Sequence, residues 1–221
     1  MAHFANLSEE NYLKALFSLS LKEVKKVNNI ALAKSLSLNP ATVLEMVRKL
    51  AKKSLVEIKD DKSISLTEKG RKKALLTVRR HRLWEVFLVD KLKYEWNEVH
   101  QLAEQLEHIE SADLTDRLDE FLGFPTFDPH GDPIPDKTGK LKLHPAIPLT
   151  SGQKGKSYQV LSFAETDDDF LDYLGKRNIR PGVKIKILEI HSYDQTMQTL
   201  IRKKEWQLSE KVAKNILVEP L

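Results

Sequence analysis

Cysteine is absent from the 221-residue chain. Its absence excludes both a disulfide framework and a metal site built on thiolates. The chain also has no run of about 20 apolar residues, the length that a membrane-spanning helix requires. Its first residues lack the basic start and apolar stretch of a signal peptide. We therefore expect a cytoplasmic protein without a membrane partner.

Positive charge is unevenly distributed. Residues 1–80 contain 17 Lys and Arg against 8 Asp and Glu, a net charge of +9, whereas the whole chain carries +4. A basic N-terminal third on a mildly acidic remainder indicates an anionic partner at one end. A solvated lysine-rich face would give the same imbalance, so the charge alone leaves both interpretations open.

The hydrophobic pattern changes along the chain from helical to strand-like. Up to residue 122 helical periodicities predominate, and the proline-rich segment 124–135 then interrupts regular structure, because proline fixes φ and lacks an N–H donor. From residue 150 onward the pattern predicts a β-rich domain. The fold class is thus mainly α with a β-rich C-terminal domain. The elements expected in that domain are a helix at Asp167–Lys176 and strands at Tyr158–Phe163, Val183–Ile190, Met197–Ile201 and Ile216–Val218.

Three amphipathic helices are predicted near the N-terminus. Asn28 and Asn39 can cap the second and third, and Pro40 suits the first turn of the third. Two short helices joined by a tight turn, the second with small N-terminal side chains, form a helix-turn-helix. The apolar positions that define the helices are Tyr12, Leu16 and Leu19, then Leu32, Ala33 and Leu36, and then Val43, Met46, Val47 and Leu50.

A hairpin is expected directly after these helices. Apolar residues alternate over Leu55–Lys59 and Ser63–Leu66 around a polar turn, which predicts the wing of a winged helix. With the basic charge, this pattern favours DNA binding, although a winged helix used for protein contacts stays an alternative. Small side chains would lie near base edges and cations near phosphates. The residues expected at the DNA are Asn39, Ala41, Thr42, Arg48, Lys49, Lys53, Lys59 and Lys62.

Histidine and glutamate recur at helical spacing in the next segment. His81 and Glu85 are four residues apart and share one helix face. Four further residues span about 100° on one side of a single predicted helix: His100, Glu104, Glu107 and His108. Imidazole and carboxylate donors suit manganese, ferrous iron, cobalt or zinc. Surface pairs of this kind also occur on helices that bind no metal.

An apolar stripe runs beside these candidate ligands. Its members are spaced by three, four and three residues, so one stripe can pack against a partner while its neighbour collects imidazole and carboxylate. We expect a dimer interface at the residues of this stripe, Val99, Leu102, Leu106 and Ile109.

These motifs resemble those of the diphtheria-toxin-repressor family of iron- and manganese-dependent transcriptional regulators, in the long form that ends in a FeoA-like barrel. The resemblance covers nearly the whole sequence. Its most specific parts are the pair Glu107-His108 and the string Pro129-His-Gly-Asp-Pro-Ile-Pro135. The other matching segments are Ser8–Phe17, Ile30–Leu50, Leu66–Gly70 and Arg80–Leu83.

The resemblance implies a domain plan. A winged-helix DNA-binding domain would cover residues 1–72, and a helical metal-binding and dimerisation domain would cover 73–140. A linker at 141–149 would lead to a FeoA-like small β-barrel at 150–221.

The resemblance also implies about two metal sites per subunit. The first would use Asn11, Glu104, Glu107 and His108, and Asn11 is a departure because relatives place Asp or Met there. The second would use His81, Glu85 and His100, joined from the barrel by Glu165 and Asp168.

Together, these observations predict a homodimeric repressor that binds operator DNA when it is loaded with Mn²⁺ or Fe²⁺ and so controls metal homeostasis. Glu104 offers a hard oxygen donor, which suits Mn²⁺. Two other functions stay open, a helical di-metal carboxylate enzyme and a metal-independent winged-helix regulator. The sequence shows neither a nucleophile–base pair nor a glycine-rich phosphate loop, so we expect no enzyme and no small organic substrate.

Overall fold

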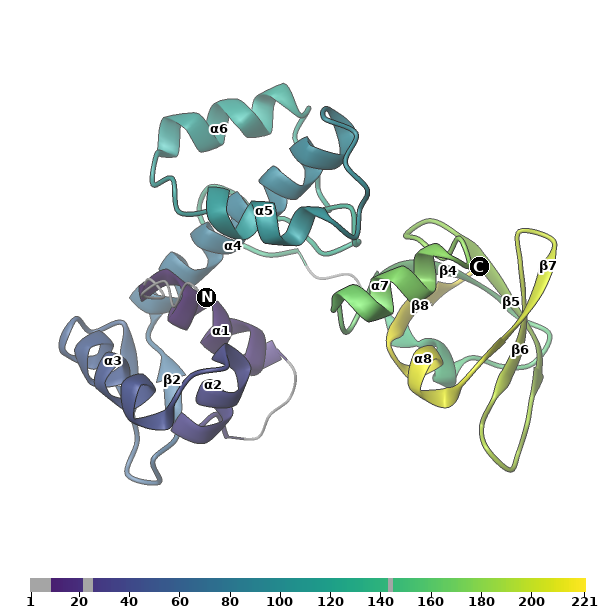
Figure 1. Ribbon diagram of the computed structural model, residues 1–221, viewed down its shortest axis with the longest axis horizontal. Helices are drawn as coiled ribbons and strands as arrows, with labels where there is room; N and C mark the ends of the chain where they lie inside the picture. The colour runs from purple at the N-terminus through teal and green to yellow at the C-terminus, as the bar shows by residue number, and fades with distance from the viewer. Residues whose placement is uncertain (1–8, 22–25, 143–144) are drawn as a thin grey trace, which may run out of the picture. The chain divides into compact units, whose positions relative to one another are not determined.

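The computed structural model describes residues 9–21, 26–142 and 145–221, without the side chain of Asp168 (Figure 1). The chain forms two compact units. The first contains the described residues up to His81 together with Leu106–Asp116 and Pro135–Leu141. The second contains Arg82–Gln105, Arg117–Ile134 and the described residues from 142 onward. None of the described helices is long and apolar enough to cross a membrane.

The first unit opens with three helices, α1 (Glu9–Leu21), α2 (Asn29–Leu36) and α3 (Pro40–Lys52). The Asn28 side chain accepts a hydrogen bond from the Ala31 N–H, and the Asn39 side chain accepts one from the Ala41 N–H. Both bonds satisfy amide donors that a helix N-terminus leaves unpaired. The two predicted caps are thus confirmed. The helices enclose an apolar core of Leu13, Leu16, Phe17, Leu32, Val43, Val47 and Leu50.

A short hairpin follows α3 and confirms the predicted wing. Strands β1 (Val56–Ile58) and β2 (Ile64–Leu66) pair antiparallel. The N–H of Ile64 also donates to the carbonyl of Val27, which ties the hairpin to the segment before α2.

Three further helices follow: α4 (Glu68–Asp90), α5 (Val99–Leu106) and α6 (Ala112–Phe121). Sequence periodicity predicted one helix through His108, and this was wrong because α5 ends at Leu106. The Arg80 side chain on α4 donates from Nε to the Glu107 carbonyl at 2.5 Å, so a side chain takes the acceptor that marks the helix end. Glu107 and His108 therefore lie in a turn of the first unit rather than on the face of α5.

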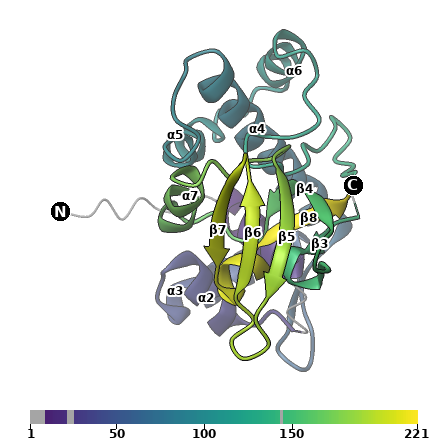
Figure 2. The same ribbon diagram turned by 90° about the vertical axis from the view of Figure 1, so that its right-hand side faces the viewer.

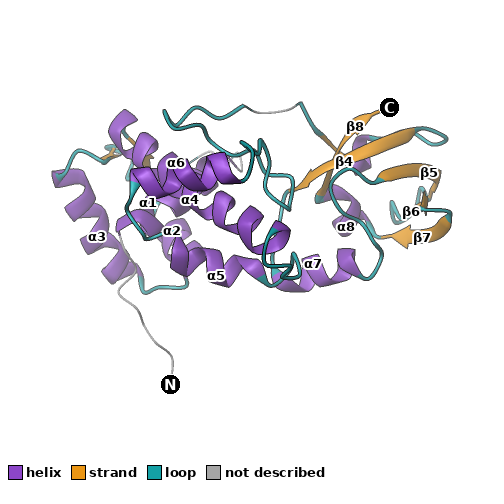
Figure 3. Ribbon diagram, turned by 90° about the horizontal axis from the view of Figure 1, so that it is seen from above, coloured by secondary structure: helices purple, strands orange, loops and turns teal. Residues whose placement is uncertain are grey.

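The second unit contains a six-stranded antiparallel sheet in the order β3-β8-β4-β5-β6-β7. Figure 2 shows β5, β6 and β7 side by side, and Figure 3 shows the strands from β4 to β8 gathered in one domain. The sheet's elements are β3 (Ile147–Pro148), a 3₁₀ turn at Leu149–Ser151, β4 (Ser157–Phe163), α7 (Asp168–Gly175), β5 (Lys184–Ile190), β6 (Met197–Ile201), β7 (Lys204–Leu208), α8 (Glu210–Lys214) and β8 (Ile216–Pro220).

The predicted strands and the helix of this domain are confirmed, whereas β3, β7 and α8 were not predicted. Strand β3 lies inside the segment 141–149 that the sequence suggested as a linker, because Ile147 and Pro148 pair with β8. The sheet and α7 enclose a core that includes Val160, Leu171, Ile185, Ile187 and Val218, and Trp96 from the segment before α5 joins it.

Candidate metal centres

The buried carboxylate of Glu107 is the middle of one polar cluster in the first unit. Lys14 on α1 donates from Nζ to both Glu107 oxygens at 2.8 Å. His81 on α4 brings its Nδ1 to 2.6 Å from Oε2 of the same carboxylate. The Glu107 side chain has no solvent exposure. A buried carboxylate requires such compensation, because removing an ion from water without partners costs several kcal/mol.

Glu10, one helical turn before Lys14, extends this cluster. Its Oε1 accepts a hydrogen bond from Arg80 at 2.6 Å, and its Oε2 lies 3.1 Å from Nδ1 of His108. Burial opposes ionisation of Glu10, but the bond with His108 and the charge of Arg80 outweigh it and lower the pKa of this carboxyl. Sequence reasoning selected Asn11 instead, which is half-buried on α1. The sequence signal for Glu10 was available, since Glu10 and Lys14 are four residues apart on α1.

We call Glu10, Lys14, Arg80, His81, Glu107 and His108 the first centre. Its donors are two carboxylates and two imidazoles, a set that fits a divalent transition metal such as Mn²⁺ or Fe²⁺. Lys14 and Arg80 balance the two carboxylate charges.

A second cluster lies wholly within the second unit. Glu85 on α4 has its Oε1 3.3 Å from Nδ1 of His100 and 3.8 Å from Nδ1 of His130. Asp128, Glu85 and His130 are all buried and offer one ligand atom each, with all three atoms within 4.8 Å of one another. Asp128 and His130 were not predicted as ligands, although they belong to the proline-rich segment 124–135. We call Glu85, His100, Asp128 and His130 the second centre.

His130 is oriented for metal binding by its other ring nitrogen. Its Nε2 lies 2.8 Å from the Trp96 carbonyl oxygen, a pure acceptor, so Nε2 must carry the proton and donate. In the neutral ring this leaves the Nδ1 lone pair directed to the side of Glu85. A hydrogen bond from the distal imidazole nitrogen to a carbonyl is the usual outer support of a histidine ligand.

A tight turn holds Asp128 and His130 in place. The Asp128 Oδ1 accepts backbone hydrogen bonds from His130 at 2.8 Å and Asp132 at 3.0 Å. Gly131 has φ +85°, and a Cβ there would lie 1.8 Å from the Leu161 carbonyl oxygen. Only glycine fits both the left-handed backbone and this close approach. In this turn Asp128 accepts the backbone hydrogen bonds and Gly131 adopts the left-handed conformation, and together they fix the position of His130 between them.

The second centre also shifts ionisation. Burial, followed by the negative charge of Glu85, raises the pKa of Asp128 to about 7, although the nearby Arg82 acts in the opposite direction. Burial disfavours the charged form of His130, but the carboxylate of Glu85, 3.8 Å from Nδ1, and the charge of Asp128 outweigh burial and raise the pKa of His130 to about 9. Both raised pKa values show that the negative charge of the buried Glu85 and Asp128 is incompletely balanced. A divalent cation bound between these side chains would supply the missing positive charge.

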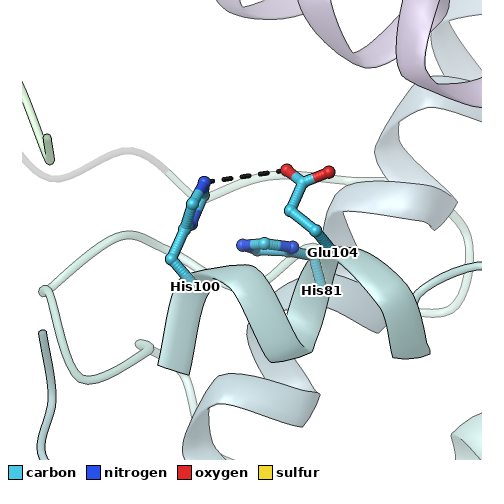
Figure 4. A group of neighbouring side chains, drawn as sticks. All are labelled: His81, His100 and Glu104. Atoms are coloured by element: carbon cyan, nitrogen blue, oxygen red, sulfur yellow. Dashed lines mark ion pairs between the residues drawn. The ribbon is translucent and has the colours of Figure 1, made fainter. Parts of the chain in front are cut away.

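The remaining predicted ligands have different surroundings. Glu104 forms an ion pair with His100 along α5, at 3.7 Å, and Figure 4 shows this pair together with His81. Glu165 is exposed and lies 3.5 Å from the Asn215 side-chain amide. The Asp168 side chain lies outside the described residues. Glu104, predicted for the first site, therefore contacts His100, which was predicted for the second. Glu165 is not part of the buried group of Glu85, Asp128 and His130.

The residues predicted at DNA all lie exposed on the first unit. Lys53 and Lys49 both pair with Glu9 on α1, at 2.6 and 3.1 Å. The hydrogen bond from Lys53 lowers the pKa of Glu9. The side-chain oxygen Oδ1 of Asn39 accepts the hydrogen bond from the Ala41 N–H that caps α3.

The predicted dimer stripe is only partly available to a partner. Val99 is fully buried within its own chain, so the prediction for this residue was wrong: no surface of its side chain is left for a second copy. Leu102 and Leu106 are half-buried, and Ile109 is exposed but lies beyond the end of α5.

Three family profiles match most of the chain. The iron dependent repressor N-terminal DNA binding domain matches residues 7–64, the iron dependent repressor metal binding and dimerisation domain matches residues 67–136, and the FeoA domain matches residues 147–220. A solved structure of a manganese-dependent transcriptional repressor in complex with manganese superposes with a TM-score of 0.87. It is 35% identical, and the match covers 97% of this chain and 100% of that one.

The chain belongs to the iron-dependent repressor family. Among curated members of the iron-dependent repressor family, the repressor IdeR of Mycobacterium tuberculosis is 36% identical over 126 residues, 57% of this chain and 54% of that protein. The chain therefore spans about half the length of this relative. The diphtheria toxin repressor of Corynebacterium diphtheriae is 28% identical over 190 residues, 81% of this chain and 84% of that protein. The resemblance drawn from the sequence motifs is confirmed at the level of the family.

Proposed function

We propose that this protein is a homodimeric transcriptional repressor that binds operator DNA through its winged helix when both metal centres are loaded. The observation that carries this proposal is the first centre, in which α1 of the winged helix meets the Glu107–His108 turn. Helix α1 supplies Glu10 and Lys14 to this cluster and Leu13, Leu16 and Phe17 to the DNA-binding core. Any change in the cluster therefore acts directly on the helix that supports α3.

The chain's own residues account for the coupling. In the structure α1 contacts the Glu107–His108 turn through Lys14, which pairs with Glu107, and through Glu10, which pairs with His108. When bound, a divalent cation supplies several short bonds to carboxylate and imidazole donors at once. Glu107, His108 and a donor from α1 would hold this cation together, and α1 would then be fixed against the Glu107–His108 turn. Both recognition helices of a dimer can then match half-sites about one DNA turn apart.

We propose a second metal site within the second unit, between α4 and the proline-rich turn. We propose Glu85, Asp128 and His130 as its ligands, with His100 beside them, in place of the triad His81, Glu85 and His100. Their burial and mutual repulsion favour a cation there. Glu165, Asp168, Asn11 and Glu104 stay candidate ligands on the resemblance alone.

Mn²⁺ is the proposed activating ion, and Fe²⁺ is the alternative. The donors of both centres are hard oxygens and imidazoles without a thiolate, a set that Mn²⁺ accepts. A related solved structure is a manganese-dependent repressor with manganese bound. The proposed function is regulatory rather than enzymatic, and it would be carried out in the cytoplasm.

The direct test is DNA binding by the chelator-treated and metal-loaded protein. Operator sequences are first selected from random duplex DNA with the Mn²⁺-loaded protein, and their binding is measured by fluorescence anisotropy with Mn²⁺, Fe²⁺ (anaerobically), Zn²⁺ or chelator. Sequence-specific binding should require metal. His108→Ala should show no sequence-specific binding, whether or not metal is added. Chelator-insensitive specific binding would instead support a metal-independent regulator.

A further inference from the structure

Lys14 occupies a position in the first centre that a metal ligand set does not require. Its Nζ lies 2.8 Å from each oxygen of Glu107, so a single positive charge bridges both acceptors of the most deeply buried carboxylate in the cluster. The lysine side chain is itself 17% exposed, which means that it reaches the site from the surface. The Lys14 ammonium thus contacts the same carboxylate oxygens that a metal ion bound at this centre would contact.

The contact has a consequence for metal affinity. Lys14 takes one lone pair on each Glu107 oxygen, and His81 approaches Oε2 as well, so most of the acceptor capacity of this carboxylate is already in use. A divalent cation bound to Glu107 would also be repelled by the Lys14 ammonium beside the same carboxylate, so the two cations compete for Glu107. A hydrogen bond to a charged group contributes about 1.5–3 kcal/mol, which corresponds to roughly a 10- to 100-fold effect on an equilibrium constant. The free energy of breaking the lysine contact is thus subtracted from the free energy of metal binding.

We propose that Lys14 is an internal competitor for the first metal centre, which sets the metal concentration at which the repressor responds. In the metal-free protein the ammonium neutralises Glu107 and keeps the buried cluster stable. For Glu107 to ligate, Lys14 must leave the carboxylate and turn to solvent along α1. A weakly bound or singly charged cation cannot replace the lysine contact, so the response is restricted to ions with strong affinity for carboxylate and imidazole. This inference rests on the proposed function, because it needs a metal at the first centre.

The experiment measures Mn²⁺ binding to the full chain, with free Mn²⁺ followed by electron paramagnetic resonance. The relevant binding phase is the one that His108→Ala removes. Lys14→Met should tighten this phase by roughly 10- to 100-fold, and Lys14→Gln, which keeps a neutral donor, should tighten it less. Lys34→Met on α2 removes the same charge from an exposed lysine and should leave the affinity unchanged.

Thermal unfolding provides a second measurement. Without metal, Lys14→Met should unfold at a lower temperature than wild type, because Glu107 loses its counter-charge, and added Mn²⁺ should raise its Tm by more than it raises that of wild type. Equal Mn²⁺ affinity in wild type, Lys14→Met and Lys14→Gln would overturn the competitor role while leaving the proposed function intact. Absence of any His108-dependent Mn²⁺ binding in wild type would overturn both.

Discussion

At the scale of single residues, the first centre depends on two neighbouring glutamates with different environments. Glu10 is buried against Arg80, whereas Glu9 pairs with half-exposed lysines. Breaking a buried ion pair leaves an uncompensated charge, but exposed pairs contribute little. Glu10→Gln should therefore lower the free energy of unfolding of the metal-free protein by about 2 kcal/mol, and Glu9→Gln by less than about 1 kcal/mol. Urea titrations of both variants test this, and equal effects would contradict the burial argument.

His130 makes the stability of the metal-free protein depend on pH. Its folded-state pKa is raised to about 9, above an unfolded value of about 6.5. The resulting stabilisation is complete below pH 6.5 and is lost as the pH rises through 9. Its size is on the order of 3 kcal/mol. Asp128, with a pKa raised to about 7, disfavours folding increasingly as the pH rises towards 7.

Urea unfolding of the chelator-treated protein between pH 6 and pH 9.5 measures this dependence. His130→Gln should flatten the decline between pH 6.5 and 9, and His191→Gln, at an exposed histidine of the sheet domain, should not. A decline of the same slope in both variants would show that another group is responsible.

Residue types and spacing predicted some members of the two clusters and missed others for a physical reason. Glu85, His100, Glu107 and His108 were selected because histidine and glutamate at helical spacing stand out. Glu10, Asp128 and His130 were missed because their roles depend on contacts between distant segments, such as the 3.1 Å approach of Glu10 to His108. Spacing within one helix says nothing about which neighbouring helix a side chain faces.

At the scale of elements, predictability followed local chemistry. The caps at Asn28 and Asn39 and the wing were predicted because each depends on residues a few positions apart. Strand β7 was missed because Arg202 and Lys203 form its two-residue turn with φ values of 48° and 68°. Such turns normally use Asn-Gly or other residues that tolerate positive φ, so this sequence gave no hairpin signal. The end of α5 was missed because it depends on a side chain from α4.

The recognition helix and wing lead to a prediction on salt dependence. If Arg48 on α3 contacts a DNA phosphate, Arg48→Met should weaken binding to all sequences alike and reduce the slope of log affinity against log salt by about one. Lys186→Met, at an exposed position on β5, should leave the slope unchanged. Fluorescence anisotropy titrations with DNA measure both variants at roughly 50 to 300 mM salt, a range over which the affinity of a protein for DNA falls steeply. An unchanged slope for Arg48→Met would remove this residue from the phosphate contacts.

At the scale of the whole molecule, the remaining question is which surface joins two copies. The second unit carries five exposed aromatic and aliphatic side chains, two directly after α4 and three at or directly after the end of α6: Leu92, Tyr94, Phe121, Phe124 and Phe127. Phe121 and Phe124 are each more than 60% exposed. The match to the dimerisation domain ends at residue 136 and includes all five. Exposed apolar side chains that lie together mark interaction sites, and Phe121, Phe124 and Phe127 follow one another closely along the chain, whereas Val99, Leu102 and Leu106 of the predicted stripe are buried or half-buried.

We therefore expect the dimer to form through Phe121 and Phe124. Phe121→Glu should place a charge in an apolar interface and weaken dimerisation by roughly 30-fold or more, since aromatic residues at the centre of an interface often contribute about 2 kcal/mol or more. Sedimentation equilibrium measures this, with Tyr193→Glu, at a fully exposed loop position, as the control that stays dimeric. The monomer should retain Mn²⁺ binding at the first centre, because the donors of that centre come from a single chain, but it should lose high-affinity operator binding, which needs two recognition helices. If Phe121→Glu stays dimeric and Leu106→Glu becomes monomeric, the interface lies on the α5 stripe instead.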